Sequence, residues 1–202
     1  MTTLLSNTIF HLSLGGTLLY PTDTIWGIGC DATNPDAIEK IYRIKQRNHS
    51  KSMLILCADE EMVRSFIPQP DPKALDLLLH SSRPTTVIFP CASGLPDNLL
   101  AADGSIGIRI PYTGPTDDGQ RLSGSVFCHE LLKAFGRPIV STSANFSGHP
   151  SPSCFNDIEM ELKAQVDYIV PPLEGTDTPN TNATGSRIVK ITTSGEIIVI
   201  RK

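Results

Sequence analysis

Residues 186–202, SRIVKITTSGEIIVIRK, contain two runs rich in β-branched residues on either side of a Ser-Gly pair. Two such runs around a short glycine-containing link predict a β-hairpin, whose strands must pair antiparallel. Strands and helices alternate along the rest of the chain, which is typical of a sheet covered by helices. The sequence therefore predicts an α/β fold: a single-domain twisted mixed β-sheet flanked by helices.

Apolar periodicity, capping residues and glycines mark the remaining elements. Asn34 is a helix N-cap followed by proline, and Gly136 ends a later helix. Gly27 and Gly29 indicate a turn after the first strand, and residues 171–185 form a long loop that is able to move. The predicted helices cover 35–46, 60–67, 72–80, 121–135 and 156–164. The predicted strands cover 17–20, 53–58, 85–90, 105–110, 139–145 and 167–170.

The composition of the chain limits the classes of protein to which it can belong. The 202 residues include 17 basic and 21 acidic side chains, a formal net charge of −4, which argues against a protein coated with positive charge. Five cysteines without a CxxC pair and five histidines without ligand spacing predict buried thiols and no protein-bound metal. The N-terminus lacks the basic start of a signal peptide, and no apolar run reaches the ~20 residues of a membrane span. We therefore expect one domain, residues 1–202, in the cytoplasm and without membrane contact.

Two predicted strands carry polar side chains on one face. In SIGIRI, residues 105–110, three isoleucines face the core and Arg109 faces the opposite way. If the strand at 139–145 continues to its end, Thr142 and Ala144 also point into the core. The polar positions of these strands are then Ser105, Ser141, Ser143 and Asn145. The alternative for STSAN is a polar loop, because Ser and Asn are common turn residues.

A basic cluster, IKQRNHSK at residues 44–51, follows the helix predicted at 35–46. Three cations within seven residues favour an anion site over a solvated helix end, which is the alternative for any one of them. The sequence contains no GxxxxGK[ST] and no GxGxxG motif, so side chains rather than a glycine-rich loop would have to bind phosphates. The cations available are Lys45, Arg47, Lys51, Arg109 and Arg201.

Covalent catalysis has little support in the sequence. No GxSxG motif is present, and no cysteine or serine has a histidine at an interpretable spacing. Asp23 is interpreted as a turn-forming residue after Pro-Thr. The sequence favours an enzyme that works by positioning and by stabilising charge.

Four motifs occur in the order known from one enzyme family. PTDTIWGIGCDA, KQR, SIGIRIP and STSANFSG resemble the motifs of the YrdC-like L-threonylcarbamoyladenylate synthases and span most of residues 15–151. The resemblance implies the family's α/β fold with a concave basic cleft, in the short form that consists of the catalytic domain. Trp26 stands where the family usually has tyrosine, and Asn48 where it has proline.

The resemblance also implies a nucleotidyltransferase reaction. L-Threonine and bicarbonate form a carbamate whose oxygen attacks the α-phosphorus of ATP, giving threonylcarbamoyl-AMP and pyrophosphate. This is the first step in forming N6-threonylcarbamoyladenosine in tRNA, and a downstream transferase uses the product. Mg²⁺ is expected on the triphosphate rather than on a protein ligand.

Roles for individual residues follow from the motif matches. The resemblance implies catalytic roles for Lys45, Arg47, Ser143 and Asn145. It implies threonine contacts at Thr22 and Arg109. Nucleotide or other substrate contacts are expected at Lys51, Ser105, Ser141, Ser151, Ser186 and Arg201.

Two other functions remain open from the sequence. One is a non-catalytic module that binds structured RNA, such as tRNA or double-stranded RNA, in the same cleft. The other is an enzyme of the same fold that transfers a carbamoyl group from another donor. Threonine-dependent release of pyrophosphate distinguishes the synthase from both.

Overall fold

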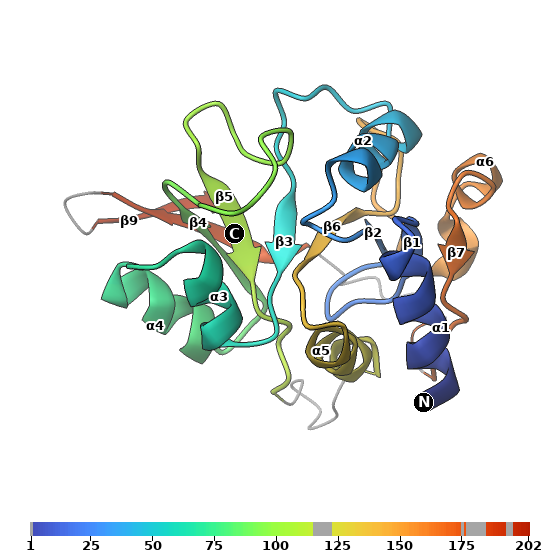
Figure 1. The fold of residues 1–202 in the computed structure, drawn as a ribbon, viewed down its shortest axis with the longest axis horizontal. Coiled ribbons are helices and arrows are strands. Elements are labelled where there is room, and N and C mark those ends of the chain that lie inside the picture. Colours follow the sequence, from blue (N-terminus) through green and yellow to red (C-terminus); the bar gives the residue numbers. More distant parts are fainter. Residues whose placement is uncertain (1, 115–122, 175, 177–184, 193–195) are drawn as a thin grey trace.

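The structure is a computed structural model that describes residues 2–114, 123–174, 176, 185–192 and 196–202 (Figure 1). Its helices are α1 (Thr2–Ser13), α2 (Pro35–Ile44), α3 (Glu60–Phe66), α4 (Pro72–His80), α5 (Ser123–Phe135) and α6 (Met160–Lys163), with a 3₁₀ turn at Phe155–Asp157. Its strands are β1 (Leu18–Tyr20), β2 (Gly27–Gly29), β3 (Leu54–Leu56), β4 (Thr85–Phe89), β5 (Ile106–Arg109), β6 (Ile139–Ser143), β7 (Tyr168–Ile169), β8 (Arg187–Ile191) and β9 (Ile197–Arg201).

The strands form one mixed sheet in the order β7-β1-β2-β6-β3-β5-β4-β8-β9. The pairs β1–β7, β3–β5 and β4–β8 are parallel, and the other neighbouring pairs are antiparallel. The terminal hairpin β8–β9 pairs antiparallel at one edge, as its sequence predicts. Figure 1 places α3 and α4 near β4 and β5, and α1 near β7 at the other end of the sheet. The predicted mixed α/β sheet with flanking helices is confirmed.

Two apolar clusters cover opposite faces of the sheet. Neighbouring residues of β6 illustrate the alternation, because Val140 packs with α2, α3 and α4 while Ile139 packs with α1 and α5. Leu56 of β3 is on the α1 and α5 face, and its register partner is Arg109 of β5. Arg109 and Ser141 therefore lie on the sheet face that α1 and α5 only partly cover.

The predicted helix signals act as expected. The Asn34 side chain caps α2 by accepting hydrogen bonds from the backbone N–H groups of Asp36 and Ala37. Gly136 has a φ of 70° immediately after α5, where its N–H bonds the Leu132 carbonyl oxygen. These two signals therefore fix where α2 begins and where α5 ends.

One helix was missed, and three local predictions were wrong. Residues 2–13 form α1, which sequence reasoning missed because Thr, Ser and Asn are weak helix formers; packing on α5 and β1 stabilises this helix instead. Gly27 and Gly29 are the first and last residues of strand β2 and do not form a turn, because β2 pairs with both β1 and β6. The strand at 139–145 ends at Ser143, and α6 begins only at Met160. Residues 121–122, the hairpin turn at 193–195 and most of the loop at 171–185 lie outside the described residues.

Candidate active site

A pocket of about 300 Å³ opens on the sheet face that carries Arg109 and Ser141. Strand residues that are paired in register form its floor: Leu54, Thr86, Ile88, Gly107, Ser141 and Ile188. The loop between β1 and β2, the residues after α2 and the end of β9 supply its walls. The sheet therefore provides a rigid base, and connecting segments provide most of the functional side chains.

Three arginines line this pocket, and no acidic side chain does so among the residues described. Arg47 donates to the carbonyl oxygens of Lys51 (2.8 Å) and Ser52 (2.9 Å), which fixes its guanidinium. Burial, together with the charge of Arg109, lowers the pKa of Arg201. Arg109 and Arg201 thus place two interacting positive charges in one pocket, an arrangement that favours an anionic ligand.

A left-handed residue after α2 separates the two cations of the KQR motif. Gln46 has a φ of 49°, its N–H bonds the Arg43 carbonyl oxygen, and the Arg47 N–H bonds the Tyr42 carbonyl oxygen at 2.9 Å. A left-handed residue at this position ends a helix and reverses the chain. The reversal leaves Lys45 on the buried side of α2 and brings Arg47 to the pocket.

Lys45 is 1% exposed and lies beneath the pocket, outside its lining. Its Nζ donates to the carbonyl oxygens of Ser143 (2.5 Å) and Asn145 (2.6 Å). Burial, and to a smaller extent the charge of Arg47, lowers the pKa of Lys45 to about 7. The ammonium group thus ties the end of α2 to the end of β6.

The lowered pKa predicts a stability that rises with pH. Between pH 7 and about 10 the unfolded chain holds a proton on Lys45 that the folded chain releases, so unfolding free energy should rise by up to ~1.4 kcal/mol per pH unit. Urea unfolding between pH 7.0 and 8.0 tests this as a difference between the wild type and Lys45→Met, because the thiols of the unfolded chain ionise at about pH 8.5 and oppose the rise in both proteins. Lys45→Met should lose this part of the slope, and Lys51→Met, at an exposed position, should keep it. Equal slopes in the wild type and Lys45→Met would contradict the prediction.

The hydroxyl groups at the pocket are held by local hydrogen bonds. The Thr22 hydroxyl donates to the Ile25 carbonyl oxygen at 2.7 Å and accepts from the Thr24 N–H at 3.0 Å. The Ser105 hydroxyl donates to Asp103 Oδ1 at 2.5 Å. These hydroxyls therefore present oxygen lone pairs, rather than protons, to a ligand in the pocket.

The guanidinium of Arg201, the last residue of β9, lies against the backbone immediately before β8. Its Nε and Nη2 donate to the Ser186 carbonyl oxygen at 2.9 and 2.6 Å, and the Ser186 and Thr86 hydroxyls are 2.7 Å apart. A Cβ atom at Gly185 would lie 2.6 Å from Arg201 Nη2. Glycine at position 185 thus allows the guanidinium to lie close against the backbone.

The row Ser141, Ser143 and Asn145 is only partly realised. Ser141 and Ser143 line the pocket, but β6 ends at Ser143 and Asn145 lies in the following turn, outside the lining. Thr142 also borders the pocket and is half-buried, but its register partner Ile28 and Val140, two positions before it, place it on the sheet face that packs with α2, and Ala144 is buried. The strand periodicity stops applying where the strand stops.

Asn145 organises the turn after β6. Its Nδ2 donates to the carbonyl oxygens of Phe146 (3.1 Å) and His149 (2.6 Å). Its Oδ1 is buried and has no hydrogen-bond partner in the described part of the chain. Together with Lys45, Asn145 holds the segment that follows Ser143.

Sequence reasoning placed nine of its twelve predicted site residues correctly in the lining but missed more than half of the lining residues. The predicted residues that line the pocket are Thr22, Arg47, Ser105, Arg109, Ser141, Ser143, Ser151, Ser186 and Arg201. The predicted residues that do not line it are Lys45, Lys51 and Asn145. Among the missed lining residues are Thr24, Ser52 and Met53. These three lie within two positions of predicted residues, and only the fold shows on which side of the loop they lie.

Asp23 is more than a turn-forming residue. Its carboxylate is buried and pairs with Arg109 at 2.5 Å. The interpretation of Asp23 as a turn residue missed this contact because Arg109 is 86 positions away in sequence. An acid flanked by a buried apolar strand and glycines was the available signal.

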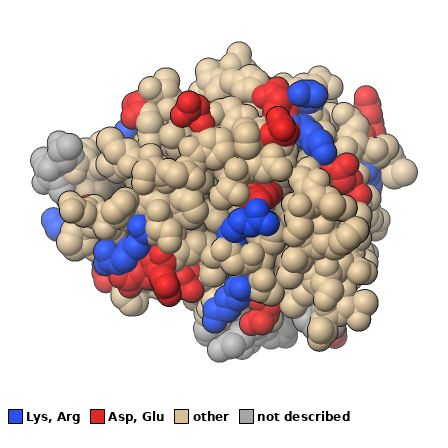
Figure 2. Space-filling model, in the orientation of Figure 1, with Lys and Arg blue, Asp and Glu red and all other residues tan. Residues whose placement is uncertain are grey.

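The surface gives less information than the pocket. On the face in Figure 2, basic and acidic side chains are interspersed over a largely uncharged surface. Among the described residues, no cluster of three His, Cys, Asp or Glu side chains could hold a metal ion, and no helix is long and apolar enough to cross a membrane. All five cysteines are free thiols. Four of them are buried, as predicted, and Cys91 is exposed.

Comparison with known proteins identifies relatives over most of the chain. A threonylcarbamoyl-AMP synthase of Marinobacter nauticus (strain ATCC 700491 / DSM 11845 / VT8) is 31% identical over 181 residues, which are 89% of this chain and 86% of the relative. The crystal structure of P. abyssi Sua5 in complex with L-threonine is similar with a TM-score of 0.80 at 19% identity. The match covers 98% of this chain and 53% of the P. abyssi chain, so the present chain spans about half of that protein.

A second solved structure and a family profile agree with this match. The crystal structure of E. coli YciO has a TM-score of 0.78 at 24% identity, and the match covers 100% of this chain and 90% of YciO. At these identities both structures support the fold alone. The Sua5/YciO/YrdC profile, described as "Telomere recombination", matches residues 11–202. The chain belongs to the Sua5/YciO/YrdC family.

Proposed function

We propose that this protein is an L-threonylcarbamoyladenylate synthase, which converts L-threonine, bicarbonate and ATP into threonylcarbamoyl-AMP and pyrophosphate. The observation that carries the proposal is the pocket on the sheet, where Arg47, Arg109 and Arg201 converge among hydroxyl groups without an acidic lining residue in the described chain. Such a pocket suits an anionic nucleotide together with a carboxylate. The similarity to threonylcarbamoyl-AMP synthases supports this reaction over other reactions that use anionic substrates.

The roles follow from position. Arg109 binds the threonine carboxylate, with Thr22 beside it. Arg47 and Arg201 act on the phosphates, where negative charge develops as the carbamate oxygen attacks and pyrophosphate leaves. Ser143 borders the same space. No protein nucleophile is needed, because the carbamate itself attacks.

The remaining nucleotide contacts lie around the floor of the pocket. Ser105, Ser141, Ser151 and Ser186 line it and offer oxygen atoms to the nucleotide. Lys51 does not line the pocket, and its exposed side chain is free to meet the outer phosphates.

Two predicted catalytic residues act indirectly in this proposal. Lys45 and Asn145 hold the end of β6 by hydrogen bonds and thereby set the position of Ser143. Mg²⁺ would be carried by the triphosphate, since hydroxyls and arginines, rather than carboxylates, line the described pocket. When bound, it would neutralise charge on the phosphates.

The partners and location are part of the same proposal. A downstream transferase would take the threonylcarbamoyl group to tRNA, and direct contact with tRNA or double-stranded RNA stays a prediction. The buried free thiols fit a reducing compartment, which supports a cytoplasmic location.

One assay tests the function against its rivals. The protein is incubated with ATP, bicarbonate and Mg²⁺ with or without L-threonine, and pyrophosphate and the mixed anhydride are measured. Threonine-dependent pyrophosphate is the expected result. Turnover with carbamoyl phosphate in place of threonine and bicarbonate would point to the carbamoyl-transfer enzyme. RNA binding without any turnover would point to the RNA-binding module.

A further inference from the structure

A buried ion pair lies against the wall of the pocket. Arg109, at the end of β5, and Asp23, in the loop between β1 and β2, are both 3% exposed, and Arg109 Nη1 is 2.5 Å from Asp23 Oδ1. The other carboxylate oxygen of Asp23 accepts a hydrogen bond from the Tyr112 N–H at 3.0 Å. Each oxygen of Asp23 is thus bound to a different partner, so the carboxylate is fixed in orientation.

The contacts of Arg109 involve one end of its guanidinium. Nη1 donates to Asp23 and, at 3.2 Å, to the Thr24 hydroxyl. Nε is buried without a hydrogen-bond partner, and Nη2 makes no hydrogen bond in the described part of the chain. The edge formed by Nε and Nη2 is the edge that can fork onto the two oxygens of a carboxylate.

We propose that Asp23 is a positioning residue that holds Arg109 by Nη1 and so reserves its Nε–Nη2 edge for the α-carboxylate of the amino-acid substrate. The inference rests on the proposed function, because it takes Arg109 as the group that meets threonine. Asp23 does not itself line the pocket. It acts through Arg109 and selects substrates that carry a free carboxylate.

Asp23 also affects Arg109 through its charge, because it is the counter-charge beside two neighbouring guanidinium groups. Arg201 lines the same pocket, and the charge of Arg109 contributes to the lowered pKa of Arg201. Without a carboxylate at position 23, the two guanidinium groups would repel each other with no counter-charge. Arg109 would then turn away from the geometry in which it can fork onto a substrate.

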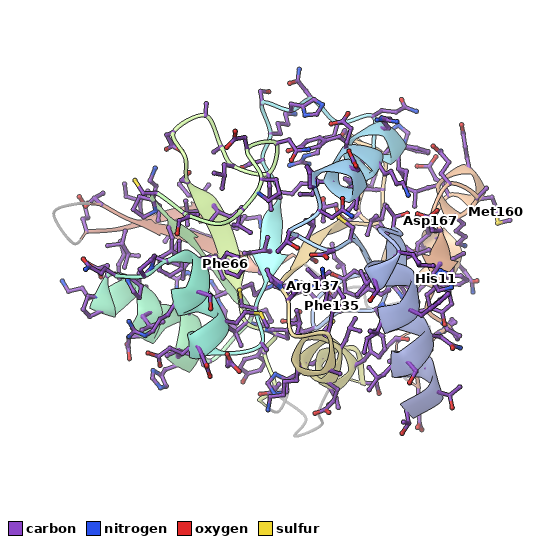
Figure 3. All side chains as sticks on the ribbon, viewed as in Figure 1. His11, Phe66, Phe135, Arg137, Met160 and Asp167 are labelled. Carbon is purple, nitrogen blue, oxygen red and sulfur yellow. The ribbon has the colours of Figure 1, made fainter. Side chains whose placement is uncertain are left out.

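A purely structural role is the alternative, and a second ion pair, between a buried aspartate and a partly exposed arginine, provides its control. Arg137 Nη1 pairs with the buried carboxylate of Asp31 at 2.5 Å, and the Arg137 guanidinium lies over the Phe135 ring (Figure 3). None of these three residues lines the pocket. Asp31→Asn therefore disturbs a buried, ion-paired carboxylate away from the substrate.

Binding can be followed by the fluorescence of Trp26, which is the one tryptophan of the chain and lines the pocket. The probes are L-threonine and L-threoninol, which has an alcohol in place of the carboxylate. In Asp23→Asn the Kd for threonine should rise about 10- to 100-fold, the size of effect expected from a misaligned binding group, while the Kd for threoninol changes less than about threefold. Asp23→Glu should recover part of the threonine affinity, and Asp31→Asn should leave both affinities unchanged.

Steady-state kinetics provide the second measurement. Asp23→Asn should raise the KM for threonine by a similar factor and change the KM for ATP by less than about threefold. Equal losses of threonine and threoninol binding, or no loss of either, would overturn the proposal. If the wild type releases no threonine-dependent pyrophosphate, the proposed function fails, whereas normal wild-type turnover with unchanged threonine binding in Asp23→Asn overturns only this inference.

Introducing Asp23→Asn into an Arg109→Gln protein tests the proposal even if Asp23→Asn alone does not fold. Arg109→Gln and Asp23→Asn/Arg109→Gln are compared, since the double variant leaves no buried charge unpaired. If Asp23 acts through Arg109, the double variant should bind threonine as Arg109→Gln does, within about twofold. A further loss of threonine affinity in the double variant would overturn the proposal.

Discussion

Arg109→Gln should raise the KM for threonine by about 100-fold, which corresponds to ~2.7 kcal/mol, and change the KM for ATP by less than about threefold. The reason is the loss of a charge-assisted, two-pronged contact from a side chain that is 3% exposed and lines the pocket. Steady-state pyrophosphate release with threonine and ATP varied separately measures both constants.

Stability must be separated from binding in this experiment, because the variant leaves Asp23 buried without its partner. Arg137→Gln is the matched control, since it also removes an arginine from a buried aspartate. The control should lose stability and keep both KM values. A threonine KM that stays unchanged in a folded Arg109→Gln protein would show that the carboxylate is bound elsewhere.

Arg47→Ala should lower kcat by about 100-fold or more, the effect seen when a fixed donor to developing charge is removed. Two backbone carbonyl groups hold the Arg47 guanidinium at 2.8 and 2.9 Å, so its charge is in place before the substrates arrive. The fold should survive, because Arg47 follows the end of α2 and is half-buried. Single-turnover pyrophosphate release and thermal unfolding are the measurements.

Arg43→Ala is the matched control for this variant. Arg43 lies one helical turn earlier, its side chain is 74% exposed, and it pairs with Glu39 on the surface. Its loss should leave kcat within about twofold of the wild type, because surface ion pairs contribute little. Near-normal turnover of Arg47→Ala would remove Arg47 from the catalytic groups.

Much of the fold was readable because its determinants are local. The Asn34 cap, the Gly136 helix end and the alternation of isoleucines in β5 depend on residues within a few positions of one another. Local backbone preference and side-chain periodicity decide such features before any tertiary contact forms.

The misread elements are those in which distant contacts override local preference. α1 is rich in weak helix formers and depends on α5 for its packing, and β2 depends on pairing with β1 and β6. Asn145 left the predicted row because β6 ends two residues earlier, where Gly27 is the register partner of Ser143. Position in a sheet cannot be read from one strand alone.

The sequence by itself determined the residue types of the site, namely the KQR motif, the arginine of β5 and the hydroxyl-rich end of β6, together with the antiparallel hairpin at the edge of the sheet. Only the tertiary structure decided which of these groups meet. It brought Asp23 to Arg109 across 86 positions and directed Lys45 to backbone carbonyl groups rather than to the pocket. The physical reason is that a buried charge must find a partner in space, and the sheet order, not the chain order, decides which partner is near.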